Sequence, residues 1–250
     1  MYTKIKGGIK VKKVVLITGG NGGIGRNVVK KFIDKGDYVI IADLNEIDYK
    51  TNETENIRFV KTDVTNVEDI KKLEEIIRNE YKHIDHIISM AGINMKSEIG
   101  GIHTITLEDI EKSIKLNLNS HIYLTKIMLD LLKKSEENRK SITMISSINA
   151  ITNYGLPAYS AGKAGIYGFM KAVTKELGKF NIRINTISLG TVPHEEDIID
   201  DNEYFEFHKS NLAIKEFVTP KDVADTIYSL VYFLKSITGQ NIILDMGQSV

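Results

Sequence analysis

Short apolar runs alternate with segments of helical periodicity along most of the chain. The runs lie at residues 14–17, 38–43, 57–64, 86–92, 141–146, 182–188 and 241–245. Apolar residues recur with helical spacing over residues 24–33, 67–81, 106–133 and 157–180, and again after 219. This alternation predicts an α/β fold, a doubly wound parallel sheet of about seven strands with helices on both faces and right-handed crossovers.

The same pattern indicates how the chain is divided. Residues 1–12 are expected to form a loose tail or an edge segment, and residues 13–250 a single domain. Three helix N-caps are expected, at Asn66, Thr106 and Thr219. Residues 191–218 fit neither period, and we expect the part from 194 to 217 to be a substrate lid. Its acidic residues are typical of a solvated face. The alternative is that its aromatic residues at 204–207 close over the substrate.

Composition and charge narrow the class of function. The chain of 250 residues has 33 basic and 33 acidic side chains, so nothing indicates a nucleic-acid or anionic-membrane surface. It has no cysteine, which excludes disulfides, thiolate zinc sites and cysteine nucleophiles. The basic N-terminus lacks an apolar core, and no run of about eighteen apolar residues occurs. We expect a cytoplasmic protein with no metal, membrane or nucleic-acid partner.

A glycine-rich turn follows the first apolar run. Residues 14–25 read VVLITGGNGGIG, in which four apolar residues lead into a turn with five glycines and then a helix. A helix N-terminus carries unpaired N–H groups and a partial positive charge, and glycines let the backbone approach a pyrophosphate closely. The spacing, TGxxxGIG, differs from the common GxGxxG pattern. By itself the stretch is also compatible with a purely structural turn.

An acidic residue ends the second apolar run. Asp43 lies eighteen residues past Gly25, where a dinucleotide-binding fold places the acid that binds the adenosine ribose. A carboxylate there would repel a 2′-phosphate, and no Lys or Arg follows Asp43 before Lys50. These features favour NAD over NADP. The alternative is that Asp43 is an ordinary turn residue at the end of a strand and has no role in cofactor binding.

The second group of candidate residues is Ser147 with Tyr159 and Lys163. Tyrosine and lysine four residues apart share one helix face. This spacing occurs at Tyr2/Lys6, Tyr159/Lys163 and Tyr167/Lys171. Only the middle pair begins a helix just after a serine-bearing strand end, at the sheet edge where open α/β folds bind ligands. A nearby ammonium favours ionisation of a phenol, so Tyr159 is suited to exchange a proton with an alcohol or carbonyl. The alternative is a packed tyrosine beside a solvated lysine.

Taken together, these motifs resemble the short-chain dehydrogenase/reductase family over residues 14–247. The resemblance implies a Rossmann-like fold, NAD as cofactor, oxidoreductase activity on CH–OH groups, and a homo-oligomer, either a dimer or a homotetramer. We expect a secondary alcohol and a ketone to be interconverted on a small polar or cyclic substrate, such as a sugar, polyol or hydroxy acid. Two alternatives stay open: a non-catalytic NAD(P)-sensing binding module, and a nucleotide-sugar epimerase or dehydratase of the same fold.

The resemblance also assigns roles to single residues. The expected catalytic residues are Asn117, Ser147, Tyr159 and Lys163. The expected cofactor-binding residues are Gly19, Asn21, Gly23, Ile24, Gly25, Asp43, Asp63, Val64, Ala91, Gly92, Tyr159, Lys163 and Val192. Asp63 and Val64 would contact the adenine, and Asn117 would hold a water that links Lys163 to solvent. A shift in local register would exchange Asn117 with Asn119.

The chain departs from the family pattern at four places. The NNAG segment reads SMAG at residues 89–92, so the asparagine that braces the central strand is absent. Pro-Gly after the sixth strand is Leu-Gly at 189–190, and the last Asp-Gly-Gly is Asp-Met-Gly at 245–247. His194 takes the place of a threonine that contacts the carboxamide. We interpret it as a loop or carboxamide contact rather than a catalytic group.

Overall fold

The computed structural model describes residues 3–5, 8–10, 12–46, 54–152, 154–193 and 202–250. Seven parallel strands form one sheet in the order β5-β4-β3-β6-β7-β8-β9. The strands are β3 (Val14–Thr18), β4 (Tyr38–Asp43), β5 (Ile57–Lys61), β6 (His86–Ser89), β7 (Lys140–Ser147), β8 (Ile182–Leu189) and β9 (Asn241–Leu244). The predicted doubly wound sheet, with its last strand at the edge, is confirmed.

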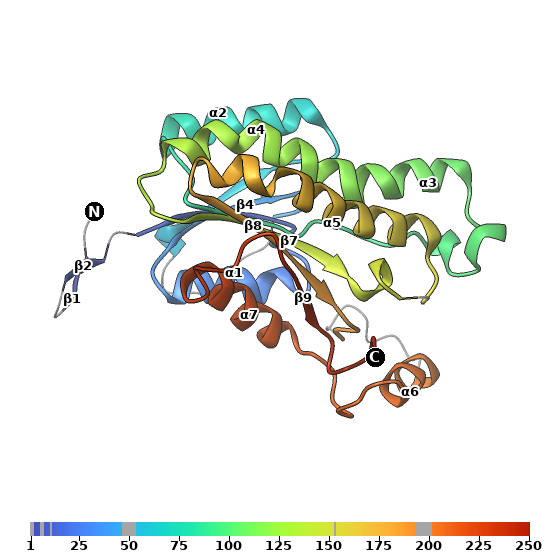
Figure 1. The fold of residues 1–250 in the computed structure, drawn as a ribbon. Helices are drawn as coiled ribbons and strands as arrows, with labels where there is room; N and C mark the ends of the chain where they lie inside the picture. Colours follow the sequence, from blue (N-terminus) through green and yellow to red (C-terminus); the bar gives the residue numbers. More distant parts are fainter. Residues whose placement is uncertain (1–2, 6–7, 11, 47–53, 153, 194–201) are drawn as a thin grey trace.

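Helices cover both faces of this sheet (Figure 1). One face carries α2 (Val67–Glu80), α4 (Ser120–Lys134) and α5 (Pro157–Gly178), and the opposite face carries α1 (Gly25–Asp34) and α7 (Pro220–Tyr232). Strand residues alternate between these layers, because successive side chains point to opposite faces of a sheet. Thus Leu16 packs with Leu73 of α2 in one core cluster, and the next residue, Ile17, packs with Phe32 of α1 in the other.

Polar side chains begin the helices at the expected residues. Asn66 accepts a hydrogen bond from the N–H of Glu68, and Thr106 accepts one from the N–H of Asp109. Each satisfies a backbone donor that has no partner within its own helix. Thr219 and Asp222 form a reciprocal capping box at the start of α7.

Three features differ from the sequence expectation. The helix expected over 106–133 is α3 (Leu107–Ile114), a π-helical turn η4 (Lys115–Asn119) and then α4. A helix absent from the prediction, α6 (Asn202–Ser210), lies within the expected lid. The N-terminal segment holds a small hairpin of β1 (Thr3–Ile5) and β2 (Gly8–Lys10), which pair with each other and not with the large sheet.

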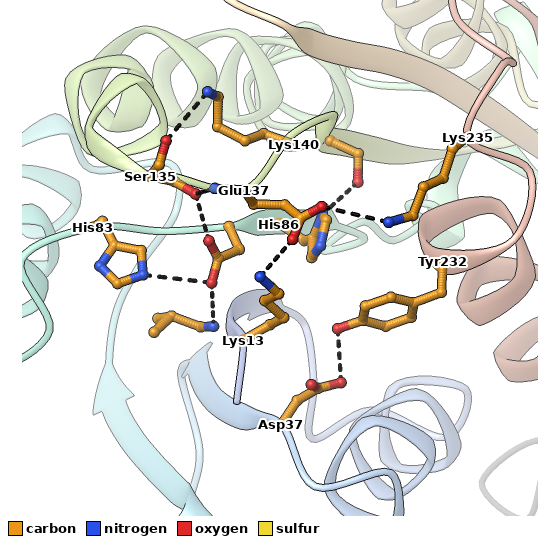
Figure 2. A network of polar contacts seen from close by, with 12 residues as sticks. Lys13, Asp37, His83, His86, Ser135, Glu137, Lys140, Tyr232 and Lys235 are labelled. Atoms are coloured by element: carbon orange, nitrogen blue, oxygen red, sulfur yellow. Dashed lines mark hydrogen bonds and ion pairs between the residues drawn. The ribbon is translucent and has the colours of Figure 1, made fainter. Parts of the chain in front are cut away.

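A network of polar groups, some of them buried, lies at the amino ends of the strands (Figure 2). Asp85 accepts hydrogen bonds from the N–H of Val14 and from Ser135, and it lies 3.5 Å from His83. Burial raises the pKa of Asp85, but hydrogen bonds from His83, Ser135 and Val14 outweigh it and lower the pKa to about 2. His86 is buried against Ser141, at 2.9 Å, and burial lowers its pKa to about 3.

We expect the protein to lose stability as pH falls below 6.5, with His86 as a main cause. Its pKa of about 3 in the folded state lies below the ordinary 6.5. Between these values the unfolded chain therefore binds a proton that the folded protein does not, which costs about 1.4 kcal/mol per pH unit. In unfolding measurements from pH 7 to 4, His86→Asn is expected to flatten this decline. His103→Asn, at an exposed histidine, is the control, and equal slopes for the two variants would contradict the assignment.

Candidate active site

The predicted motifs come together in one cavity at the carboxyl edge of the sheet. The cavity has a volume of about 840 Å³. The expected residues that line it are Gly19, Gly23, Ile24, Gly25, Asp43, Asp63, Val64, Ala91, Gly92, Ser147, Tyr159, Lys163 and Val192. Two expected residues lie outside this lining, namely Asn21 and Asn117. The cavity reaches from the glycine turn and Asp43 at one end to Tyr159 at the other, so it has the groups that a dinucleotide needs at both ends.

The glycine turn brings two backbone segments closer than side chains permit. Gly19 has a φ of +69°, and a Cβ on it would lie 2.9 Å from the Cα of Ala91. A Cβ on Gly25 would lie 2.1 Å from the carbonyl oxygen of Gly19. The helix that follows, α1, has no side-chain cap and no acidic residue in its first turn. Its positive end is therefore left available to an anion, which fits a pyrophosphate.

Asp43 ends β4 and is held in place at the wall of the cavity. Its carboxylate accepts hydrogen bonds from the N–H of Asn21 at 3.0 Å and of Leu44 at 2.7 Å. Asn21, a residue of the turn, is buried, and its side chain donates to the carbonyl of Asn45. Asn21 therefore holds Asp43 in place and does not line the cavity. This carboxylate is positioned to accept hydrogen bonds from ribose hydroxyls.

The next strand supplies a second acidic residue. Asp63 follows β5 and accepts hydrogen bonds from the N–H and the hydroxyl of Thr65, both at 2.8 Å. Val64 is nearly buried beside it. Both residues line the cavity next to Asp43, where the adenine contact was expected.

Tyr159 and Lys163 share the inward face of α5. Lys163 is 2% exposed, and its Nζ donates a hydrogen bond to the carbonyl of Ile145 at 3.0 Å. The same Nζ lies 5.6 Å from the centre of the Tyr159 ring. Burial lowers the pKa of Lys163 to about 8, because the charged form is poorly solvated there.

The other tyrosine and lysine pair on α5 has similar local geometry in a different place. The Nζ of Lys171 lies 5.3 Å from the centre of the Tyr167 ring and donates to the carbonyl of Gly239 at 2.6 Å. Neither residue lines the cavity, and Tyr167 is 40% exposed. The pair at Tyr2 and Lys6 lies outside the described residues. The two pairs on α5 therefore share the same sequence spacing, but only Tyr159 and Lys163 line the cavity.

Ser147 and Asn117 approach the same end of the cavity from other elements. Ser147 ends β7, and its Oγ donates to Oδ1 of Asn149 at 3.0 Å. Asn117 lies in the π-helical turn, fully buried, and binds both backbone groups of Ile93, at 2.8 and 3.2 Å. A Cβ on Gly92 would lie 2.8 Å from both Asn117 Oδ1 and Lys163 Nζ, so these two side chains flank Gly92.

The departure at residues 89–92 is compensated by a pair that the sequence did not reveal. Ser89 hydrogen-bonds Nδ1 of His121 at 2.7 Å, and both residues are buried. The pair joins β6 to α4 near Lys163. Burial, with the nearby Lys163, lowers the pKa of His121 well below 6.5, so this histidine is neutral. No sequence signal links the two positions, which are 32 residues apart.

A second unforeseen residue, Gln248, joins the loop after β8 to α6 and to Tyr154. Its Oε1 accepts from the N–H of Thr191 at 2.8 Å, and its Nε2 lies 3.0 Å from Nδ1 of His208 on α6. Its carbonyl accepts from the hydroxyl of Tyr154 at 2.9 Å. A Cβ on Gly190 would lie 2.8 Å from Gln248 Oε1, so the C-terminal segment packs directly on the loop that follows β8.

The expected lid is described only in part. His194 and the acidic residues up to Asp201 lie outside the described residues. On α6, Phe207 is 59% exposed, whereas Phe205 contacts Phe217 with ring centres 6.0 Å apart.

Two further features of the described residues concern metal binding and the spanning of a membrane. Within residues 12–46, 54–152, 154–193 and 202–250, no group of three or more His, Asp and Glu side chains is arranged to hold a metal ion. In the described part of the chain, no helix is long and apolar enough to cross a membrane.

Comparison with known proteins places this geometry in a family. Residues 19–249 match the family model described as enoyl-(acyl carrier protein) reductase. The chain is 28% identical to 7alpha-hydroxysteroid dehydrogenase of Bacteroides fragilis, with 95% of each chain covered. It is 30% identical to a 3-oxoacyl-(acyl-carrier-protein) reductase of Chlamydia pneumoniae, over 95% of this chain and 97% of the relative.

The fold is also similar to solved structures. A short-chain dehydrogenase from Leptospira borgpetersenii with bound NAD+ superposes with a TM-score of 0.85 and 26% identity. The match covers 96% of this chain and 93% of that structure. The likeness therefore extends over the whole domain and its cavity.

Proposed function

This chain belongs to the short-chain dehydrogenase/reductase family of oxidoreductases, and we propose that it uses NAD(H) to interconvert a secondary alcohol and a ketone on a small polar or cyclic substrate. One observation carries the proposal. Ser147, Tyr159 and Lys163 line the same cavity as the glycine turn and Asp43. A phenol, an ammonium and a hydroxyl thus share one end of a cavity whose other end suits a nucleotide.

The lining residues fit an NAD molecule. The backbone of residues 19–25 and the positive end of α1 would hold the pyrophosphate, and Asp43 the adenosine ribose. Asp63 and Val64 would contact the adenine, and Ala91, Gly92 and Val192 would line the path to Tyr159. The carboxylate of Asp43, fixed by three backbone N–H groups, supports NAD over NADP because it would repel a 2′-phosphate.

Each catalytic side chain has one task in the proposed reaction. Bound NAD supplies the hydride acceptor, and NADH the donor. In the oxidation direction Tyr159, as phenolate, takes the hydroxyl proton of the alcohol, while Ser147 hydrogen-bonds the reacting oxygen. Lys163 binds the cofactor ribose and favours the phenolate of Tyr159 through its charge. Asn117, whose Oδ1 lies as close as the Nζ of Lys163 to the position of a Cβ on Gly92, would support the water that supplies protons to Lys163.

Thermal unfolding with NADH and NADPH in parallel tests the proposed cofactor. A ligand at 100 times its dissociation constant adds about 2.7 kcal/mol to the free energy of unfolding, so the preferred cofactor will raise the melting temperature more. We expect the larger rise with NADH, and we expect Asp43→Ala to narrow the difference. Asp34→Ala, at the exposed end of α1 where Asp34 pairs with Lys30, is the control. A larger rise with NADPH would contradict the proposal.

Absorbance of the nicotinamide then identifies the substrate. A panel of sugars, polyols, hydroxy acids and hydroxysteroids covers polar, anionic and apolar alcohols. The proposal expects turnover among the small polar or cyclic members. Turnover of none of them in either direction would favour the binding-module alternative.

We also propose that the protein is a homo-oligomer, a dimer or tetramer, in the cytoplasm. Apolar side chains are exposed on α5, just after α7 and on the edge strand β9: Tyr167 is 40% exposed, Phe233 73% and Ile243 48%. These surfaces suit two-fold contacts between copies of the chain. The sequence without cysteine suits a reducing compartment. A monomeric mass by light scattering at micromolar concentration would contradict the assembly.

A further inference from the structure

A buried glutamate reaches the first turn of the catalytic helix from a distant segment. Glu98 ends the short helix η2 (Lys96–Glu98) between β6 and α3, and it is fully buried. Its Oε2 accepts a hydrogen bond from the backbone N–H of Tyr159 at 2.9 Å. Its Oε1 is also buried and has no hydrogen-bond partner among the described residues. A carboxylate without full compensation is costly to bury, so its presence here calls for a reason.

The start of α5 lacks a cap of its own. Leu156 occupies the N-cap position, with a φ of +58°, and its side chain has no oxygen to accept a hydrogen bond. Pro157 is the first helical residue, so the N–H of Tyr159 belongs to the third. That is the donor that a capping side chain normally satisfies, as Thr219 does for the N–H of Asp222. Glu98 therefore acts as the cap, from 61 residues away along the chain.

The charge of Glu98 suits this place. The N-terminus of a helix carries a partial positive charge that stabilises a carboxylate, and α5 is a long helix of 22 residues. No acidic residue occupies the first turn of α5 itself. The helix dipole thus offsets part of the cost of burying Glu98.

The segment that ends at Glu98 starts at another catalytic element. Asn117 binds both the N–H and the carbonyl of Ile93, at 3.2 and 2.8 Å. Five residues later, Glu98 binds the N–H of Tyr159. Residues 93–98 therefore connect the π-helical turn of Asn117 to the first turn of α5. Ser97 adds a third attachment, through a hydrogen bond of 2.5 Å to Asp109 on α3.

We propose that Glu98 is a positioning residue for the reaction, which holds the first turn of α5 so that Tyr159 keeps its place relative to Asn117 and Lys163. The inference rests on the proposed role of Tyr159. Glu98 acts through the backbone of Tyr159 and does not line the cavity. Its acceptor oxygen, more than its charge, is what the position requires, because the bond goes to a neutral N–H group.

Two variants with side chains of similar size distinguish the effect of the hydrogen-bond acceptor at position 98 from the effect of side-chain packing there. Glu98→Gln keeps an oxygen that can accept from Tyr159, whereas Glu98→Met fills the site without an acceptor. In E98M we expect the amides of residues 158–160 to exchange with deuterium at least tenfold faster, and kcat for the best substrate of the panel to fall at least tenfold. KM for NADH should change little, because residues 19–25 and Asp43 are untouched. E98Q should stay within about threefold of the wild type in all three measurements.

Controls make each outcome decisive. Thr219→Ala removes the equivalent cap of α7, away from the cavity, and is expected to lower the melting temperature without changing kcat. If T219A lowers kcat as much as E98M, the effect is general destabilisation and the inference fails. It also fails if E98M exchanges and turns over like the wild type, or if E98Q is as impaired as E98M.

Two further variants cover the remaining cases. If E98M does not fold, Glu98→Asp takes its place, because the side chain is one methylene shorter and falls short of the N–H of Tyr159. E98D should then show the same loss of protection and turnover, and wild-type values would overturn the inference.

Tyr159→Phe is measured in parallel. If Y159F keeps full turnover, the proposed function fails, whereas an inactive Y159F beside a fully active E98M removes only the role of Glu98.

Discussion

Replacing Tyr159 with phenylalanine is expected to lower turnover by roughly 10²–10⁴-fold, the range that a positioned general acid or base supplies. The change removes one hydroxyl at the end of the cavity and leaves the ring on α5. The glycine turn and Asp43, which would hold the nucleotide, lie at the other end of the cavity. NADH should therefore raise the melting temperature of Y159F as much as that of the wild type.

Tyr167→Phe is the matched control for this experiment. Tyr167 lies on the same helix with a lysine four residues later, and the lysine Nζ is 5.3 Å from its ring centre, against 5.6 Å for the pair at Tyr159. Because Tyr167 lies outside the cavity lining, we expect Y167F to keep its turnover. Near-normal turnover in Y159F would remove the proposed proton transfer.

Replacing Lys163 with methionine is expected to abolish most activity and to stabilise the protein. Without the ammonium, Tyr159 loses the charge that favours its phenolate, and the cofactor ribose loses a donor, so we expect kcat/KM to fall by at least roughly 10²-fold. At pH 7 the lysine is charged in both the folded and the unfolded states. Its pKa of about 8 in the folded protein, against 10.5 ordinarily, corresponds to a penalty of about 3 kcal/mol for burying that charge.

The sign of the stability change follows from proton binding. Between pH 8 and 10.5 the unfolded chain holds a proton on Lys163 that the folded protein has released, so stability rises with pH across this window. Methionine removes the penalty but also the hydrogen bond to Ile145, worth about 1 kcal/mol. We therefore expect K163M to be more stable by about 2 kcal/mol at pH 7, with a flatter dependence above pH 8.

Chemical denaturation at pH 7 and pH 10 measures both effects. Lys171→Met is the control, because Lys171 lies on the same helix and donates to a backbone carbonyl in the same way but remains outside the cavity. We expect K171M to keep its activity and to gain no stability. A K163M protein that is less stable than the wild type at pH 7 would show that the buried ammonium is better compensated than its low pKa indicates.

Local sequence signals predicted most of the helices and strands and half of the residues that line the cavity. The caps at Asn66, Thr106 and Thr219 bind the N–H groups that a capping residue is expected to bind. Such contacts span two or three residues, so spacing alone reveals them. The helix α6 escaped prediction because its residues follow no clear period. Within it, Phe207 is exposed while Phe205 packs on Phe217, which comes after the end of the helix.

Contacts between distant residues could not be read in this way. Ser89 and His121 form a hydrogen bond where the family pattern has an asparagine brace, and Glu98 replaces the missing cap of α5. Each pairing depends on how β6, α4 and α5 pack, and no spacing in the chain encodes that distance. The same holds for Asn21, an expected cofactor-binding residue, which is buried, hydrogen-bonds Asp43 and lies outside the cavity lining.

The sequence by itself determined the alternation of strands and helices, the glycine turn and the acid that follows it, because periodicity and backbone sterics act over a few residues. It left two pairs of tyrosine and lysine on one helix with the same spacing. The position of Tyr159 and Lys163, at the start of a helix just after a serine-bearing strand end, already favoured that pair. Only the tertiary structure shows that Gly92, Asn117 and Ile145 lie against Lys163, whereas Lys171 lies outside the cavity. Packing across the whole domain determines which of the two lysine ammonium groups is buried away from water. The spacing of residues along the chain does not determine this.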